Sequence, residues 1–139
     1  MAAVRILGID PGTQCVGFAC LELPVAQAGR VAGEVPLALR ASNTVKVASG
    51  GGDVRMVEFG VLRLGTRNTP LPERLLALGG QFRELLARFA PQEVALEEAF
   101  YGKSVQAALR IGEARGVILA ESARAGLEVE VRHDEIRPP

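Results

Sequence analysis

A short, almost continuously apolar run at Val4–Ile9 is the feature that most limits what this chain can fold into. Such a run is typical of a strand buried on both faces of a sheet. It ends at Asp-Pro-Gly-Thr, where Pro11 and Gly12 predict a turn. Because a residue before proline favours extended geometry, we expect Asp10 at the very end of the strand.

The remaining pattern predicts an α/β domain with a mixed sheet. Two further strands should follow the first as an antiparallel meander, and strands that then alternate with helices should join in parallel. We also expect helices on both faces of the sheet. The predicted elements after the first strand are strands at 16–23 and 54–64, a helix within 68–91, a strand at 94–96, a helix at 104–125 and a strand at 127–132.

The chain of 139 residues fits a single domain, 1–139, with one insertion. Residues 24–53 are rich in Gly, Ala and Ser and show no sustained period. A connection of this length is uncommon inside a compact domain, so we expect a flexible insertion. Its Ser-Gly-Gly-Gly-Asp end lacks the lysine and the helix start of a phosphate-binding loop.

Composition excludes a membrane-spanning protein and gives no basic footprint. The chain has 16 basic and 16 acidic residues, and no apolar run approaches the ~18 residues of a membrane span. The N-terminus lacks a secretory signal, so we expect a cytoplasmic protein. Cys15 and Cys20 lie five residues apart on one predicted strand, where a disulfide has poor geometry, and we expect two small buried hydrophobic side chains.

Two predicted strands end in carboxylates. Glu97 and Glu98 follow the strand at 94–96, and the topology places that strand beside the first, so Asp10 should lie close by. Carboxylates at such an edge would suit Mg²⁺ or Mn²⁺. Only one of the two glutamates can point inward along an alternating strand, and spacing does not say which. The alternative is a turn-forming Asp10 beside a solvated strand end.

The sequence resembles the RuvC family of Holliday-junction resolvases in two motifs. The first is ILGIDPGT followed by CVGFA, an opening that the actin-like sugar and acetate kinases partly share. The second, ALEEAFYGKSVQAALRIGEARGVIL at 95–119, is highly specific. It combines a strand-end acid, an aromatic, a lysine and a patterned helix, here Glu97, Phe100, Lys103, Leu109, Gly112, Ala114, Arg115 and Gly116. The resemblance covers nearly the whole chain except 24–53 and implies a ribonuclease-H-like fold.

The resemblance implies a structure-selective endodeoxyribonuclease. Such an enzyme resolves Holliday junctions in recombination and DNA repair by symmetric, metal-dependent phosphodiester hydrolysis. It would make Asp10 and Glu97 catalytic metal ligands, held near two Mg²⁺ or Mn²⁺ ions about 4 Å apart. The matching DNA contacts are Phe100 and Tyr101, which would stack on bases, and Lys103, which would contact a phosphate.

Further roles and partners follow from the same resemblance. Glu98, Arg110 and Arg137 would support the site or contact phosphates. A two-fold junction suits a homodimer, and the family also works with branch-migration motor proteins. A ridge of small side chains on the second helix would let another element approach closely, although packing on the domain's own sheet is the favoured alternative; the ridge is Ala108, Gly112, Gly116 and Ala120.

The chain departs from the family pattern after its last strand. The family's other two catalytic aspartates lie on a C-terminal helix, which this sequence does not contain, and Asp134 and Glu135 do not match them. His133 is expected to be solvated. The nuclease domain is therefore expected to be C-terminally incomplete and inactive alone. Alternatives are a catalytically incomplete DNA-binding or structural relative, an actin-like kinase fragment, and the short putative resolvases that process ribosomal RNA, which lack the aromatic–lysine signature.

Overall fold

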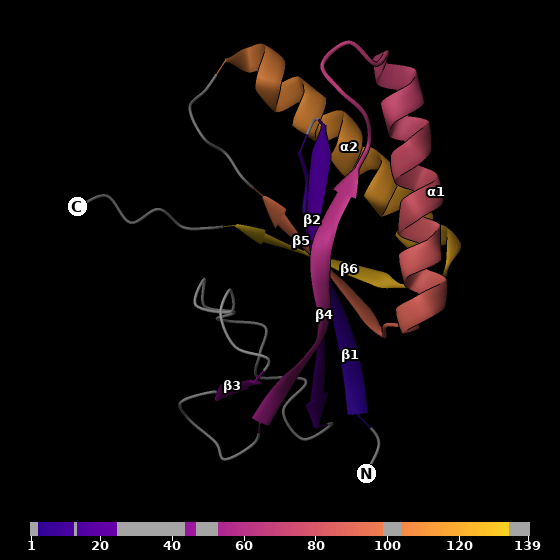
Figure 1. The fold of residues 1–139 in the computed structure, drawn as a ribbon. Coiled ribbons are helices and arrows are strands. Elements are labelled where there is room, and N and C mark those ends of the chain that lie inside the picture. Colours follow the sequence, from indigo (N-terminus) through magenta and orange to yellow (C-terminus); the bar gives the residue numbers. More distant parts are fainter. Residues whose placement is uncertain (1–2, 13, 25–43, 47–52, 99–103, 134–139) are drawn as a thin grey trace, which may run out of the picture.

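The computed structural model describes residues 3–12, 14–24, 44–46, 53–98 and 104–133. Over these ranges it forms one six-stranded sheet, in the order β3-β4-β2-β1-β5-β6, with two helices (Figure 1). The strands are β1 (Ala3–Asp10), β2 (Cys15–Pro24), β3 (Thr44–Lys46), β4 (Asp53–Arg63), β5 (Glu93–Glu98) and β6 (Glu128–His133). The helices are α1 (Leu71–Phe89) and α2 (Val105–Arg124).

The pairing of the strands confirms the predicted topology. Strand β1 pairs with β2, and β2 with β4, in antiparallel fashion, whereas β5 joins β1 and β6 joins β5 in parallel. Strand β3 was not expected, because three residues are too few to show an alternating pattern. It lies inside the range 24–53 and pairs with the start of β4. The rest of that insertion lies outside the described residues, so its flexibility and the single-domain organisation stay predictions.

Both described helices pack on the same face of the sheet, which we call the helix face (Figure 1). This differs from the expectation of helices on both faces. Alternating residues of β1, β2, β4 and β5 point into one core with the two helices, because successive side chains of a strand face opposite ways. The buried members of this core are Leu7, Ile9, Val16, Cys20, Leu62, Leu64, Leu78, Phe82, Leu85, Phe89, Val94, Leu96, Ala114 and Ile118.

Helix α1 has the apolar face that its sequence predicts. Leu78, Phe82, Leu85 and Phe89 are buried at steps of three and four residues. Proline lies in the first turn, where its missing N–H costs no hydrogen bond. The helix ends at Phe89, and its C-cap Ala90 directly precedes the next proline. These apolar positions anchor α1 across the middle of the sheet.

Helix α2 buries a different face from the one that its sequence suggested. Its buried residues are Ala114, Ile118, Glu121 and Ser122, all from the tenth residue of the helix onward. No residue of 105–113 is buried. The ridge of small side chains points to solvent, and exposed apolar residues flank it, so packing of the ridge on the domain's own sheet was the wrong expectation. The exposed set is Val105, Ala108, Leu109, Gly112, Gly116, Leu119 and Ala120.

The reason for this error is that both faces of α2 carry apolar residues. Ile111, Val117 and Ile118 recur at helical spacing as regularly as Leu109, Gly112 and Gly116 do. Periodicity alone therefore supports two opposite orientations. Contacts with α1 decide between them: a Cβ at Gly79 of α1 would lie 3.6 Å from a Cγ1 atom of Val117.

The orientation of α2 predicts a contrast between two substitutions. Ile118→Ala should lower the free energy of unfolding by about 2–5 kcal/mol, because Ile118 is fully buried. Leu109→Ala should change it by no more than about 0.5 kcal/mol, because that side chain is 62% exposed. Urea denaturation at low protein concentration measures both. Equal destabilisation by the two variants would contradict the orientation.

The two cysteines lie on opposite faces of β2. Cys20 is fully buried in the core, as expected, whereas Cys15 is exposed, so the prediction of two buried cysteines was wrong for Cys15. Their separation of five residues puts them on opposite sides of an alternating strand. Both are free thiols. Burial raises the pKa of the Cys20 thiol.

Thiol chemistry should distinguish the two cysteines. Because a raised pKa lowers the fraction of reactive thiolate at neutral pH, Cys20 should react with a thiol reagent only after unfolding. Cys15 should react in the native protein. Intact mass after brief labelling should therefore show one adduct, and Cys15→Ser should show none. Two adducts under native conditions would contradict the burial of Cys20.

Candidate active site

The register between β1 and β5 brings the two predicted catalytic carboxylates together. The last pair between these parallel strands is Ile9 with Leu96, and the next residues along the two strands are Asp10 and Glu97. Ile9 and Leu96 point into the helix-side core, so Asp10 and Glu97 face the opposite side of the sheet, which we call the open face. Neighbouring strands lie about 5 Å apart, so the two carboxylates are adjacent.

The same row of the sheet continues on both sides of the carboxylates. Gly17 of β2 is paired with Asp10, and the backbone of Arg132 in β6 is paired with that of Glu97. A Cβ at Gly17 would lie 3.6 Å from the Cβ of Asp10, so glycine leaves that flank open. Asp10 is exposed, and no described residue donates a hydrogen bond to its carboxylate. Glu97 is half-buried.

A tight turn fixes the end of β1. A Cβ at Gly12 would lie 2.2 Å from the carbonyl oxygen of Cys15, so only glycine fits there. The backbone N–H of Leu64 donates to the carbonyl oxygen of Gln14 at 2.9 Å and ties the turn to the end of β4. Asp10 therefore projects from a defined strand end.

The open face beside the carboxylates has an apolar floor. Gly8, Ala19 and Ala95 form the next row of the sheet, and Phe59 of β4 continues it. Phe59 is 60% exposed and Val61 is 56% exposed. Sequence reasoning took these two residues only as strand formers. Their alternation with the buried Leu62 and Leu64 is the signal that places them on the open face.

The carboxylate pair fits part of a divalent-metal site. Two hard oxygen ligands on adjacent strands, one of them without a hydrogen-bond donor among the described residues, suit Mg²⁺ or Mn²⁺. The described residues contain no group of three or more His, Cys, Asp or Glu that could hold a metal. The pair thus supplies some of the ligands that such an ion needs.

Comparison with known proteins places the chain in a family. The family model described as crossover junction endodeoxyribonuclease RuvC matches residues 36–135. The chain belongs to the RuvC family. A RuvC relative from Chloroflexus aggregans is 36% identical over 126 residues, which are 91% of this chain and 60% of the relative. One from Roseiflexus is 34% identical over 129 residues, 93% of this chain and 61% of the relative.

This chain thus spans about 60% of the length of the RuvC relatives that it matches. Solved structures agree on the fold. Thermus thermophilus RuvC in complex with a Holliday junction substrate superposes with a TM-score of 0.69 at 22% identity, covering 93% of this chain and 65% of that one. The yeast mitochondrial Holliday junction resolvase Ydc2 gives 0.51 at 16% identity, covering 92% and 52%. The predicted ribonuclease-H-like α/β class is confirmed.

The structure places only some of the predicted RuvC site residues. Phe100, Tyr101, Lys103 and Arg137 lie outside the described residues, as do Asp134 and Glu135. For Glu98 only the backbone is described, at the end of β5 opposite that of His133. Arg110 is exposed on the second turn of α2. The side chain of Ser104 caps α2 by accepting a hydrogen bond from the backbone N–H of Ala107, so the predicted DNA contacts directly precede a well-defined helix start.

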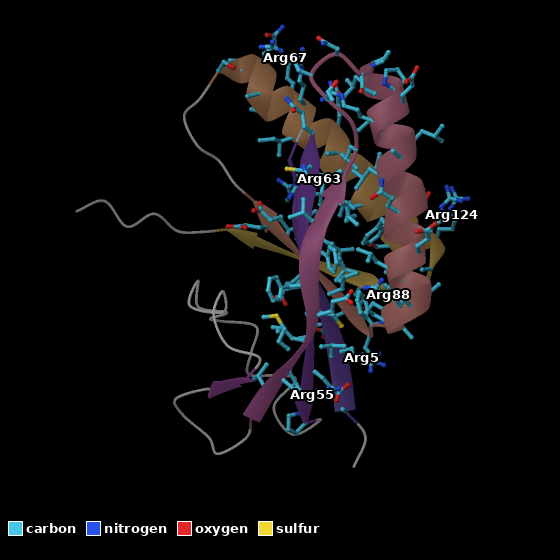
Figure 2. All side chains as sticks on the ribbon, viewed as in Figure 1. Arg5, Arg55, Arg63, Arg67, Arg88 and Arg124 are labelled. Atoms are coloured by element: carbon cyan, nitrogen blue, oxygen red, sulfur yellow. The ribbon has the colours of Figure 1, made fainter. Side chains whose placement is uncertain are left out.

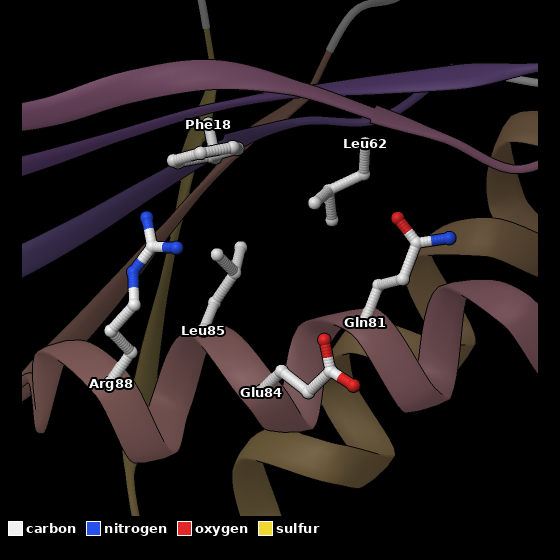
Figure 3. Close-up of a pocket in the computed structure, with 6 residues that line it drawn as sticks. All are labelled: Phe18, Leu62, Gln81, Glu84, Leu85 and Arg88. Carbon is white, nitrogen blue, oxygen red and sulfur yellow. The ribbon is translucent and has the colours of Figure 1, made fainter.

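A separate pocket lies on the helix face and does not belong to this site. It has a volume of about 260 Å³ and lies between the sheet and α1 (Figure 3). Phe18, Leu62 and Leu85 form its apolar part, and Gln81, Glu84 and Arg88 line its rim. The sheet separates it from Asp10 and Glu97. No helix in the described part of the chain is long and apolar enough to cross a membrane.

Proposed function

We propose that this protein is a metal-dependent endonuclease that resolves four-way DNA junctions in recombination and repair. The observation that carries the proposal is the position of Asp10 and Glu97 at the ends of the neighbouring strands β1 and β5, one residue beyond the paired Ile9 and Leu96. Membership of the RuvC family supports the substrate class. The solved complex of a Thermus relative with a Holliday junction is consistent with it.

The chemistry is phosphodiester hydrolysis. A water oxygen forms a bond to phosphorus, and the bond from phosphorus to the 3′ oxygen breaks, leaving a 3′-hydroxyl and a 5′-phosphate. Bound Mg²⁺ or Mn²⁺, expected as two ions, would lower the pKa of that water and neutralise developing charge. Asp10 and Glu97 would hold the ions, and the turn at Gly12 would fix the strand end that carries Asp10.

Residues beside the pair have proposed supporting roles. By family resemblance, Phe100 and Tyr101 stack on bases at the junction, and Lys103 contacts a phosphate. Arg110 and Arg137 add phosphate contacts, and Glu98 supports the metal site. The exposed position of Arg110 near the start of α2 is compatible with its role.

Two carboxylates alone do not complete a two-ion site, so we propose that a further segment supplies the others. The open face supports this view, because Phe59 and Val61 expose apolar surface beside Asp10 that a covering segment would bury. This chain spans 60% of the Chloroflexus aggregans relative, so that relative has further segments that could hold such ligands. The second candidate function is a relative that binds junctions without cutting them.

We propose that the exposed face of α2 forms a homodimer interface. Val105, Leu109 and Leu119 expose apolar surface along one side of this helix. Between them, a Cβ at Gly112 or Gly116 would meet nothing within 4 Å, so a second backbone can approach closely. A two-fold dimer would present two sites to a junction that is itself two-fold symmetric. A branch-migration motor as partner and a cytoplasmic location stay predictions.

Substitution of the carboxylates tests the nuclease proposal in protein of full natural length. Asp10→Asn and Glu97→Gln should each lower Mg²⁺-dependent nicking of a synthetic junction more than about 100-fold, because even loss of an outer-shell partner of a metal costs 10–100-fold. Junction affinity in Ca²⁺ should change little, and Mn²⁺ binding by calorimetry should weaken.

Glu84→Gln is the matched control for this test, since Glu84 is exposed on α1 and lines the pocket on the other face. It should cut like wild type. Retained cleavage by Asp10→Asn or Glu97→Gln would exclude the assigned site. A wild-type protein that binds the junction without ever cutting it would favour the non-cutting relative.

A charged side chain between the exposed apolar residues of α2, at Gly112, tests the dimer interface. Gly112→Arg should shift the protein to monomer in analytical ultracentrifugation without unfolding it, as circular dichroism would show, because the site is open in the monomer. Gly80→Arg is the control: Gly80 is an equally open, exposed glycine on α1 and lies off the proposed interface. A dimer that survives Gly112→Arg would contradict this interface.

A further inference from the structure

The arginines of the described part differ in whether an acid accompanies them. Glu22 accepts hydrogen bonds from Arg5 at 3.0 Å and Arg55 at 3.1 Å, and these hold the pKa of its carboxyl below the usual range. Glu121 lies 3.1 Å from Arg83 and 3.6 Å from Arg124. Arg88 pairs with Glu58. These side chains have structural partners.

Arg63 and Arg67 have no such partner among the described residues, and both are exposed. In Figure 2 Arg67 lies at the top, near the start of α2, and Arg63 lies below it near the end of β4, whereas Arg88, Arg5 and Arg55 lie farther down and Arg124 lies to the side. Arg110, on the second turn of α2, likewise has no acidic partner among described residues, and the first turn of α2 carries no acid. These three arginines therefore form no ion pair with a described residue and lie toward the end of the sheet that carries Asp10.

Strand register places Arg63 on the open face with the carboxylates. Arg63 is paired with Cys15, and two residues earlier Val61 is paired with Gly17, which is itself paired with Asp10. Arg63 is thus two strands across and two residues along from Asp10. With strands about 4.8 Å apart and a rise of about 3.4 Å per residue, the two Cα atoms are about 12 Å apart.

Arg67 projects from a turn that is held by its own hydrogen bonds. The N–H of Thr66 donates to Oγ1 of Thr69 at 3.0 Å, and the N–H of Asn68 donates to Oγ1 of Thr66 at 3.2 Å. The buried Arg74 donates from Nε to the carbonyl oxygen of Thr69 at 3.0 Å. Holding the backbone in this way lowers the entropy cost of using Arg67 as a contact.

We propose that Arg63 and Arg67 form a phosphate-binding arginine pair that contacts the DNA backbone next to the cleavage site. The proposal rests on the proposed function and adds to it a contact surface on the β4–α1 side of the carboxylates. Guanidinium groups bind phosphate through paired, charge-assisted hydrogen bonds. With its Cα about 12 Å from that of Asp10, Arg63 would contact the strand beside the scissile phosphate.

Salt dependence of junction binding tests this pair, with the full-length protein and a synthetic four-way junction in Ca²⁺. The double variant Arg63→Gln/Arg67→Gln should flatten the slope of log affinity against log salt by about 1.8, since each lost phosphate contact contributes about 0.9. Cleavage at sub-saturating junction should fall in step with the lost affinity. Arg63→Lys/Arg67→Lys should restore most of the slope.

Arg124→Gln is the matched control, because it removes an equal charge per site at the far end of α2, where the side chain is 72% exposed. It should leave the slope unchanged. An unchanged slope in the correctly folded Arg63→Gln/Arg67→Gln variant would overturn the arginine pair, and so would an equal loss in Arg124→Gln. If the double variant does not fold, the exposed turn variant Arg67→Gln alone must flatten the slope by about 0.9. Failure of the wild-type protein to prefer junctions would instead overturn the proposed function.

Discussion

The parallel pairing of β1 with β5 is the constraint on which the rest of the structure depends. It fixes Ile9 opposite Leu96 in the core and so sets Asp10 and Glu97 side by side on the other face. A slip of one residue in this register would exchange the two faces and bury the carboxylates. Leu7, Val94 and their neighbours therefore keep the site in place by filling the core beneath α1 and α2.

Much of the fold was predictable because local signals and topology agreed. Apolar strands, the proline positions of α1 and the alternation of helices with strands all point to one arrangement. The joint position of Asp10 and Glu97 followed from that arrangement, whereas the choice of Glu97 over Glu98 needed the family motif. The sequence could not orient α2, since Gly112 and Ile118 lie on faces that are both apolar. It also missed β3, whose edge pairing depends on β4 rather than on its own pattern.

A net charge of zero concealed an uneven distribution of positive charge. Acidic residues accompany most arginines away from the carboxylate end, so these contribute to holding strands and helices together rather than to an external field. Arg63, Arg67 and Arg110 have no acidic ion-pair partner among the described residues. Counting charges along a sequence cannot separate these two groups, because the partners of Arg5 and Arg83 are distant in the chain.

The uneven attachment of α2 has a consequence for its dynamics. Ala114 and Ile118 hold it from its tenth residue onward, whereas residues 105–113 bury no side chain in the core. Opening the first two turns breaks few packing contacts, so their amides should exchange with solvent through a local fluctuation that requires much less free energy than global unfolding. These turns follow the segment that carries the aromatic and lysine signature of the family. Any partner that covers the exposed side of α2 would suppress this fluctuation, so part of its binding free energy would be spent on ordering these two turns.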